Sequence, residues 1–343
     1  VELRPSPPHP LARRLDGVLR TGWPDMALRR WSPGFASVLR DLMREERYDI
    51  VEAEGIEMAR YLPLADGARK IFSDHNVEHL LQRRAYVVDR ARPLRWPLAA
   101  YSYVQAERLT RFERAACRRA DRVVTVSEED AGALRALEPS GRYAIVPNAI
   151  DVAAYPRRAG WPARPGILFA GTLDYRPNAD AVHWLLDEIA PLVHARQPEA
   201  RVFVVGRDPA ADVVARGQHD PRIAVTGAVE SLERYWARAT AYALPMRGGG
   251  GVRFKALEAM AAGLPIVSTR MGMEGIDAEP GTHYLAADTP PAFADALVRL
   301  LEDRNLRERI AENAARLVRE RYDWRAVAPK LLAVYHDVAG GAA

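Results

Sequence analysis

Short apolar segments rich in β-branched residues recur along this chain, and stretches with helical spacing of apolar residues separate them. This alternation is typical of parallel α/β sheets. In the first half the predicted strands are 49–52, 70–73, 122–126 and 143–146; in the second half they are 166–170, 201–205, 223–226, 241–244, 266–268 and 283–286.

The predicted helices fall between these strands. Ser127 followed by Asp130 has the form of an N-cap with a reciprocal acid at N3, which predicts a short helix there. The other predicted helices are 35–46, 79–89, 97–120, 179–197, 232–239, 253–262, 291–302, 305–321 and 324–338.

Two α/β arrays follow one another in the 343 residues, which is enough chain for two separate cores. The segment 151–165 contains Pro156, Gly160, Pro162 and Pro165 and is the predicted linker. We therefore expect one parallel α/β domain over 1–150 and another over 166–323. Ligands of such sheets bind at the carboxyl ends of the strands, and a cleft between two domains is the expected pocket.

Composition narrows the class of protein. Hydrophobic residues make up 48% and charged residues 27%, as in ordinary globular proteins. Cys117 is the one cysteine, so an intrachain disulfide is excluded and a reducing compartment is expected. No stretch resembles a signal peptide or a membrane span. A formal net charge of +4 is too small to indicate nucleic acid as a partner.

The charge is unevenly distributed. Residues 82–122 contain eleven Arg against four acidic residues, with five aromatic residues interleaved. Basic residues mixed with aromatic ones suit the surface of an anionic membrane. A long helix with a solvated face and a buried aromatic stripe accounts for the same pattern, and both interpretations stay open.

The most informative segment is the glycine loop 248–251 and the predicted helix that follows it. Unblocked backbone N–H groups at a helix N-terminus form an anion site, and glycines let a ligand approach the backbone closely. Arg253 and Lys255 place two cations at the end of the helix where the dipole disfavours them, which a bound phosphate would offset. Lys occurs at only three positions, so 46 of the 49 basic residues are Arg. The alternative is a surface turn before an ordinary solvated helix.

Several short motifs resemble GT-B glycosyltransferases of the family 4, or group 1, type. The most specific is 255–267, KALEAMAAGLPIV; the others are VPNAID at 146–151, FAGTL at 169–173, VVG at 204–206, VTGAV at 225–229 and YDW at 322–324. The resemblance implies two Rossmann-like domains facing across a cleft, the second holding a nucleotide-activated sugar. It also implies that the final helix, 324–343, returns to the first domain.

The resemblance assigns roles to particular residues. Glu258 matches the family's ribose-binding glutamate, and His75 matches the histidine that reaches toward the donor sugar. Lys255 and Arg253 are expected to stabilise charge on the leaving diphosphate, which makes these two and His75 the predicted catalytic residues. The predicted donor-binding residues are Gly171, Arg176, Gly206, Gly227, Ala228, Gly250, Gly251, Phe254, Glu258 and Glu274.

Three features depart from the family pattern. Gly250 stands where the family places the first glutamate of its Glu-x7-Glu motif, and Glu274 is a candidate substitute. The basic pair that many relatives carry after the first strand of the second domain is absent, and Arg176 could replace part of it. We find no strand with a glycine-rich loop before Asp49, so we expect the first domain to lack at least one β-α-β unit.

The sequence therefore predicts an enzyme that moves a sugar from a nucleoside diphosphate sugar to a hydroxyl acceptor, a glycan or a lipid-linked group. We expect no cofactor and no metal, retention of configuration, and a cytoplasmic location at the inner face of a membrane. A GT-B sugar-nucleotide epimerase and a nucleotide-binding module without turnover are the alternatives. The base, the sugar, the acceptor and the oligomeric state are not readable from the sequence.

Overall fold

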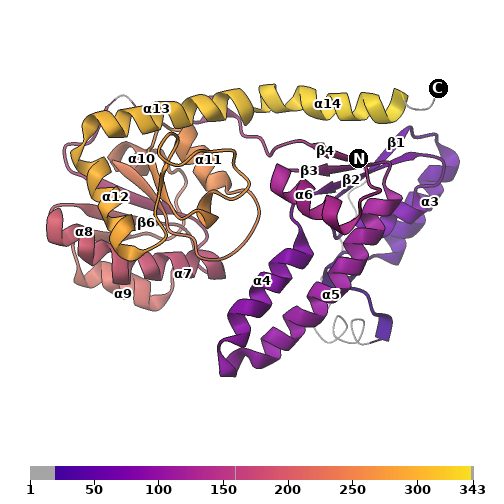
Figure 1. The fold of residues 1–343 in the computed structure, drawn as a ribbon, viewed down its shortest axis with the longest axis horizontal. Helices are drawn as coiled ribbons and strands as arrows, with labels where there is room; N and C mark the ends of the chain where they lie inside the picture. The colour runs from indigo at the N-terminus through magenta and orange to yellow at the C-terminus, as the bar shows by residue number, and fades with distance from the viewer. Residues whose placement is uncertain (1–19, 159, 341–343) are drawn as a thin grey trace. The chain divides into compact units, whose positions relative to one another are not determined.

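A computed structural model describes residues 20–158 and 160–340 of the chain, and these form two compact units (Figure 1). The first unit comprises residues up to Pro147 together with residues from Ala328 onward, and the second comprises Asn148–Val327. Each unit is built on one parallel sheet with helices around it, as the alternation of strands and helices predicts.

The sheet of the first unit has the order β1-β2-β3-β4, with β1 at Ile50–Glu54, β2 at Arg69–Asp74, β3 at Arg122–Thr125 and β4 at Tyr143–Ile145. Its helices are α2 (Asp25–Arg29), α3 (Pro33–Glu45), α4 (Glu78–Arg90), α5 (Trp96–Arg119) and α6 (Glu128–Leu137), with 3-10 turns η1 (Ala59–Leu64) and η2 (Pro93–Arg95). The predicted cap is confirmed, because the Ser127 hydroxyl accepts a hydrogen bond from the Asp130 amide at 3.1 Å.

Successive residues of a strand point to opposite faces of a sheet, and this explains how the first unit is covered. Phe72 on β2 and Val123 on β3 belong to a core with residues of η1, α5 and α6. Their neighbours Ile71 and Val124 face the other side, where they pack against the end of α14 (Trp324–Gly340). On that side the Tyr335 hydroxyl donates to the Glu52 carboxylate at 2.5 Å.

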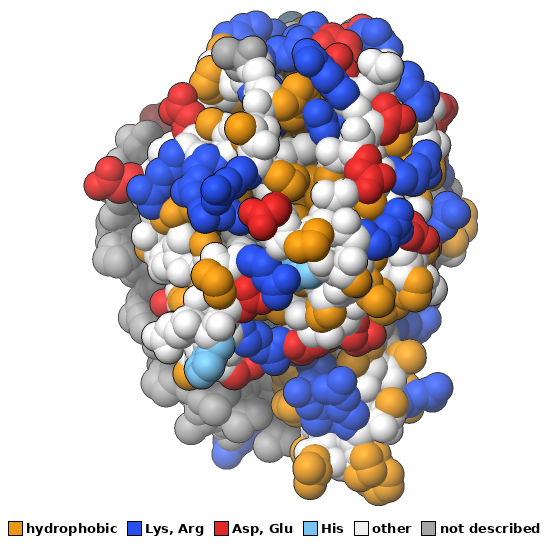
Figure 2. All heavy atoms as spheres, turned by 90° about the vertical axis from the view of Figure 1, so that its left-hand side faces the viewer, with side chains coloured by type: hydrophobic (Ala, Val, Ile, Leu, Met, Phe, Trp, Pro, Cys, Tyr) orange, Lys and Arg blue, Asp and Glu red, His pale blue; other side chains and the backbone are white. Residues whose placement is uncertain are grey.

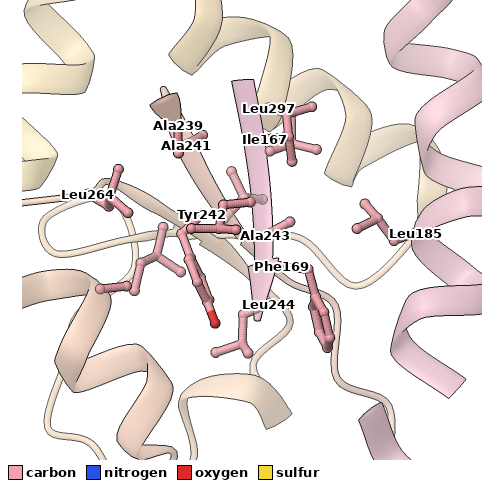
Figure 3. Packing of buried hydrophobic residues seen from close by; sticks show 14 of the residues in the cluster. Ile167, Phe169, Leu185, Ala239, Ala241, Tyr242, Ala243, Leu244, Leu264 and Leu297 are labelled. Carbon is pink, nitrogen blue, oxygen red and sulfur yellow. The ribbon is translucent and has the colours of Figure 1, made fainter. Parts of the chain in front are cut away.

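The sheet of the second unit has the order β10-β9-β8-β5-β6-β7. Its strands are β5 (Gly166–Ala170), β6 (Arg201–Val205), β7 (Ile223–Val225), β8 (Ala241–Leu244), β9 (Ile266–Ser268) and β10 (Leu285–Ala286). The strands β5 and β8 are fully buried and lie at the centre of its hydrophobic core (Figure 3). The chain runs outward from β5 to β7 and then crosses to β8 on the other side of β5, so the strand order reverses between β5 and β8.

The helices of the second unit are α7 (Arg176–Trp184), α8 (Ala190–Arg196), α9 (Ala211–His219), α10 (Glu233–Arg238), α11 (Phe254–Ala261), α12 (Pro290–Glu302) and α13 (Arg304–Arg321). It also contains 3-10 turns η3 (Val152–Ala154) and η5 (Met271–Met273). The sequence pattern did not predict α2 or α9, which have five and nine residues.

The prediction of one continuous helix over 179–197 is wrong. Between α7 and α8 the chain forms a π-helical turn, η4 at Leu185–Ile189. Pro191 follows this turn at the second position of α8 and has no N–H to donate to the turn before it. The missing hydrogen bond gives a physical reason for the wider turn.

The boundary between the units lies at Pro147 and Asn148, so the predicted linker 151–165 falls within the second unit. This segment is tied to that unit by the backbone: Ile150 donates to the Tyr322 carbonyl at 2.9 Å, and Trp324 donates to the Ile150 carbonyl at 3.0 Å. The last helix belongs to the first unit from Ala328 onward.

Two glycines allow the ends of β5 and β6 to come together. The Gly171 amide donates to the Val205 carbonyl at 3.0 Å. A Cβ atom on Gly206 would lie 1.7 Å from the Gly171 carbonyl oxygen, which is a backbone atom that cannot rotate away. Glycine is therefore required at position 206 for the two strand ends to keep this distance.

We expect Gly206→Ala to lower the free energy of unfolding by about 1–3 kcal/mol, because one of the two strand ends must shift. Urea denaturation measures this loss. Gly227→Ala is the matched control, since a Cβ atom there meets nothing within 4 Å. Equal stability of the two variants would contradict the close approach.

Candidate functional site

Several of the residues predicted to bind the donor lie near the point where the strand order of the second unit reverses. In an open α/β sheet this point, at the carboxyl ends of the strands, is where ligands bind. Gly171 follows β5, Gly206 follows β6, and the glycine loop 248–251 lies between β8 and α11. The sheet order thus brings together three segments that are far apart in the sequence.

Lys255 lies in the first turn of α11, and its ammonium group points toward the end of β5. The Nζ atom donates to Asn178 Oδ1 at 2.6 Å and lies 4.0 Å from the Met246 sulfur and 4.9 Å from the centre of the Phe169 ring. A Cβ atom on Gly171 would lie 3.2 Å from Nζ. The ammonium group and the Gly171 backbone are therefore immediate neighbours.

The surroundings of this ammonium group disfavour its charge. Burial and, to a smaller extent, the nearby Arg253 guanidinium lower the pKa of Lys255, and the Glu258 carboxylate acts in the opposite direction; the net result is a pKa of about 7. A cation in this position gains stability when an anion binds beside it. Lys255 thus has the electrostatic character expected of a group that meets a phosphate.

Asn178 is a residue of this site that the sequence pattern did not reveal. Its side chain is buried; the amide nitrogen donates to the Thr172 carbonyl at 2.8 Å, while the oxygen accepts from Lys255. The first bond fixes which end of the amide faces the ammonium group. Asn178 therefore positions the Lys255 ammonium group. It lies on α7, outside the sequence motif that contains Lys255.

Arg253 shapes the glycine loop from inside. Its guanidinium donates to the Gly250 carbonyl at 2.7 Å and to the Gly248 carbonyl at 3.3 Å, and the residue is 7% exposed. Gly249 and Gly251 have φ values of +91° and +74°, a conformation that favours glycine. The loop is thus a folded turn around a buried cation.

The start of the loop is anchored by an ion pair. Arg247 makes two hydrogen bonds to the Asp180 carboxylate, at 2.8 and 3.0 Å, and its guanidinium lies over the Trp184 ring. Neither Arg247 nor Asp180 was predicted as a site residue. A bidentate pair fixes orientation as well as distance, so it holds the loop against α7.

Glu258 lies one turn after Lys255 and has a partner within its own unit. The Tyr155 hydroxyl donates to its carboxylate at 3.1 Å. Burial, together with the charge of Glu258, raises the pKa of Tyr155 to about 12, so this hydroxyl keeps its proton at neutral pH. Tyr155 was not predicted, and it brings the segment after residue 148 to the site.

The other predicted donor-binding residues lie at various distances along the sheet edge. Arg176 begins α7 and Phe254 begins α11, and both are exposed. Gly227 and Ala228 follow β7, the edge strand two places from β5, and are also exposed. Glu274 follows η5, and a Cβ atom on its neighbour Gly275 would lie 2.9 Å from the Val252 side chain, so this turn lies against the glycine loop.

His75 belongs to the first unit, where it follows β2. Its Nε2 atom lies 2.8 Å from a Glu54 carboxylate oxygen, and both side chains are exposed. The preceding residue, Asp74, is 1% exposed. Burial raises the pKa of the Asp74 carboxyl well above its usual range, and the nearby Glu113 carboxylate adds to the increase.

A group of acidic residues surrounds Asp74 in the first unit. Glu113 is fully buried and pairs with His79, accepting from its backbone amide at 3.1 Å and contacting its ring nitrogen Nδ1. Burial raises the pKa of Glu78 to about 7, and Glu113 again contributes. His79 is thus the partner of a buried carboxylate, a role that differs from that of the exposed His75.

The described residues, 20–158 and 160–340, contain no group of three or more His, Cys, Asp or Glu side chains placed to hold a metal ion. Within the same residues, no helix has both the length and the apolar character needed to cross a membrane.

Two family models match the chain. The model described as Glycosyl transferases group 1 matches residues 164–303, and the model described as Glycosyltransferase Family 4 matches residues 3–154. Together the two matches cover most of both units.

Named relatives share the sequence over part of their length. The phosphatidyl-myo-inositol mannosyltransferase of Mycobacterium tuberculosis is 33% identical over 223 residues, which are 60% of this chain and 57% of that protein. The sulfoquinovosyl transferase SQD2 of Arabidopsis thaliana is 28% identical over 183 residues, which are 50% of this chain and 33% of that protein. The matched region thus spans little more than half the length of the first relative.

Solved structures share the fold. Sucrose-phosphate synthase from Thermosynechococcus elongatus is 18% identical with a TM-score of 0.72, and the match covers 90% of this chain and 78% of that one. HepE of Anabaena in complex with UDP is 15% identical with a TM-score of 0.64, and the match covers 92% of this chain and 85% of that one. At these identities the likeness establishes the fold of this chain.

The position of Lys255 against Asn178 can be tested by measuring the pKa of its ammonium group. We expect Lys255 to titrate near pH 7 and to titrate lower in Asn178→Ala, because the amide oxygen stabilises the charged form. NMR of protein labelled with 13C at lysine Cε measures this, and the three lysines keep the spectrum simple.

Substitution of Lys255 by Arg identifies its signal in that experiment. Asn305→Ala, at an exposed position of α13, is the matched control and should leave the Lys255 titration unchanged. A Lys255 pKa that is the same with and without the Asn178 side chain would refute the positioning role of Asn178.

Proposed function

We propose that this chain, which belongs to the group 1 glycosyltransferases with a GT-B fold, transfers a sugar from a nucleoside diphosphate sugar to a hydroxyl group of an acceptor. The observation that carries the proposal is the Lys255 ammonium group, set beside the Gly171 backbone at the point where the strand order reverses. A diphosphate bound there would meet the cation and the N-terminal end of α11 together.

In this reaction the bond between the anomeric carbon and the diphosphate oxygen breaks, and its electron pair stays on the diphosphate. The acceptor oxygen bonds to the anomeric carbon, and its proton passes to the leaving diphosphate. Lys255 stabilises the negative charge that develops on the leaving diphosphate, and preorganised positive charge of this kind lowers the barrier. Arg253 contributes by holding the loop that surrounds the diphosphate.

The donor contacts follow from the same arrangement. Glu258 receives the ribose hydroxyls, and the Tyr155 hydroxyl holds its carboxylate in place. The diphosphate sugar approaches the backbone closely at four glycines: Gly171, Gly206, Gly250 and Gly251. The base contacts Gly227 and Ala228. The sugar and the phosphates lie beside Glu274, Arg176 and Phe254. For His75 we propose contact with the donor sugar, the role that the family resemblance implies.

The finer features of the reaction belong to this proposal. Because Lys255 and α11 supply positive charge, the transfer proceeds without a divalent cation at the diphosphate and uses no cofactor beyond the nucleotide sugar. It retains the anomeric configuration. The name of one relative, a phosphatidyl-myo-inositol mannosyltransferase, supports a lipid-linked acceptor, and a glycan is the other acceptor class of this proposal. We place the reaction at the cytoplasmic face of a membrane. The UDP complex of HepE supports a uridine nucleotide.

Calorimetric titration with UDP, GDP, ADP and dTDP tests the donor site, each with and without magnesium. We expect one of these nucleotides to bind equally well in both conditions. Lys255→Met should weaken the diphosphate by at least about tenfold, as expected for a lost charge-assisted contact, and leave the corresponding nucleoside unaffected. Lys330→Met, at an exposed position of α14, is the matched control.

Glu258→Ala should weaken nucleoside and diphosphate by the same factor, since both contain the ribose. Binding that requires magnesium, or equal losses of nucleoside and diphosphate in Lys255→Met, would contradict the proposed site. Donor hydrolysis, followed by NMR of the released sugar, then separates an enzyme from a nucleotide-binding module and reports the anomeric configuration.

Protonation of Lys255 gives an independent check of the phosphate contact. Without a nucleotide, the Lys255 ammonium group is charged below pH 7 and largely neutral above it. A bound diphosphate raises the pKa of this group, because negative charge stabilises its protonated form. We therefore expect nucleotide binding to take up a proton at pH 8 and much less at pH 6. Calorimetric titrations in buffers of different ionisation enthalpy measure the proton uptake. If Lys255→Met takes up the same number of protons at pH 8, the uptake belongs to another group.

A further inference from the structure

The helices α4 and α5 form a hairpin that extends away from the sheet of the first unit (Figure 1). They are joined by residues 91–95, which include the 3-10 turn η2. The Tyr86 and Tyr103 rings meet across the hairpin with their centres 5.4 Å apart. The two helices thus contact each other near the turn, and the hairpin belongs to the first unit, whereas Lys255 and the glycine loop belong to the second.

Large apolar side chains are exposed at the end of this hairpin. Leu94 is 98% exposed and Trp96 is 62% exposed. Val87, Val88, Leu98 and Tyr103 are each about half exposed or close to it, and they lie within two helical turns of the hairpin end. Exposed apolar residues scattered singly need no explanation, whereas a group of six around one turn marks an interaction site.

Specific bonds hold the turn between the two helices. Asp89, which is 2% exposed, pairs with the Arg95 guanidinium at 3.3 Å. The Trp96 indole N–H donates to the Arg90 carbonyl at 3.2 Å. The polar atom of the indole is therefore satisfied within the protein, and the ring can enter an apolar medium without leaving a donor unpaired.

Basic side chains surround the apolar group. Residues 82–104 contain five Arg and a single acidic residue, Asp89, which is buried. Arg83, Arg84, Arg90 and Arg92 are exposed. In Figure 2 the end of the hairpin lies at the bottom of the view, where orange hydrophobic and blue basic side chains adjoin one another.

A groove continues the apolar surface between the two helices. Its volume is about 830 Å³, and its lining is mostly apolar or aromatic. On the α5 side the groove is lined by Trp96 and Tyr103, and on the α4 side by Tyr86 and Val87. Arg90 is the charged residue in this lining.

We propose that the end of the α4–α5 hairpin inserts into an anionic lipid bilayer. Leu94 and the Trp96 ring enter the boundary between headgroups and acyl chains, and the exposed arginines bind the anionic headgroups. An apolar tip surrounded by cations matches a membrane surface, which presents negative charge outside and hydrocarbon beneath. This docking goes beyond sugar transfer and does not depend on which acceptor the chain uses.

Vesicle sedimentation of the whole chain tests the docking. We expect strong binding to phosphatidylcholine vesicles that contain about a third phosphatidylglycerol, and binding at least about tenfold weaker to phosphatidylcholine alone. Leu94→Asp should weaken binding to the anionic vesicles by about tenfold or more, because it removes an inserted side chain. Arg92→Glu should weaken the same binding and reduce its dependence on salt.

Matched controls carry the same chemical changes outside the hairpin. Leu332→Asp lies on α14 at a side chain that is 54% exposed, and Arg299→Glu lies at an exposed position of α12. Both should bind anionic vesicles like the unaltered chain. We expect Leu94→Asp to bind nucleotide as tightly as the unaltered chain does. This measurement shows whether the variant is folded, and it does not depend on vesicle binding.

Acyl-chain contact is read from lipids brominated along the chain, which quench a tryptophan that reaches them. Quenching should occur with the unaltered chain and decrease in Trp96→Phe. Equal binding to neutral and anionic vesicles, or unchanged binding by Leu94→Asp, overturns the proposal. A second result also overturns the proposal: the unaltered chain does not bind vesicles but self-associates, as measured by light scattering, and Leu94→Asp abolishes the self-association. The end of the hairpin would then bind a second copy of the chain.

Discussion

The ammonium group of Lys255 is the feature on which the proposed chemistry depends. It is held by a neutral amide oxygen, a thioether sulfur and the face of an aromatic ring. Such partners orient a cation but neutralise little of its charge, and burial lowers its pKa toward 7. An anion at this position therefore gains the interaction that the protein alone leaves incomplete, and the carboxyl ends of β5 and β8 form the edge where it would bind.

The glycine loop and Arg253 complement this cation in different ways. Arg253 uses two N–H groups on the carbonyls of Gly248 and Gly250, so its first task is to hold the loop in shape. Gly250 stands where the resemblance in sequence implies a glutamate, and its backbone carbonyl accepts a hydrogen bond from Arg253. The residue at this position therefore takes part in the loop through its backbone carbonyl. The two cations thus have different positions: Arg253 holds the loop, and Lys255 faces the backbone of Gly171.

The strands and most helices could be predicted from the sequence because their signals are local. A buried parallel strand is an apolar run, and Ser127 before three acidic residues marks a helix start. The π-helical turn before Pro191 escaped prediction because apolar periodicity is the same on both sides of it. The short helix α9 contains Gly217 and has only nine residues, so it presents a weak pattern.

The parts of the site that could not be predicted are those fixed by contacts between distant segments. Lys255 and Glu258 stand in a sequence motif, but their partners Asn178 and Tyr155 lie 77 and 103 residues away. Nothing local distinguishes Asn178 from any polar residue at a helix start; its role follows from the order of the strands, which places α7 beside α11's first turn.

The α4–α5 hairpin shows how structure decides between two interpretations that a sequence leaves open. Part of the aromatic and apolar pattern in 82–122 is core, since Leu109 and Phe112 are buried against the first unit's sheet. The rest, around Leu94 and Trp96, lies beyond that core and is exposed. One amphipathic stretch therefore does two things along its length: its later part stabilises the unit, and its early part presents an apolar end that the fold itself does not cover.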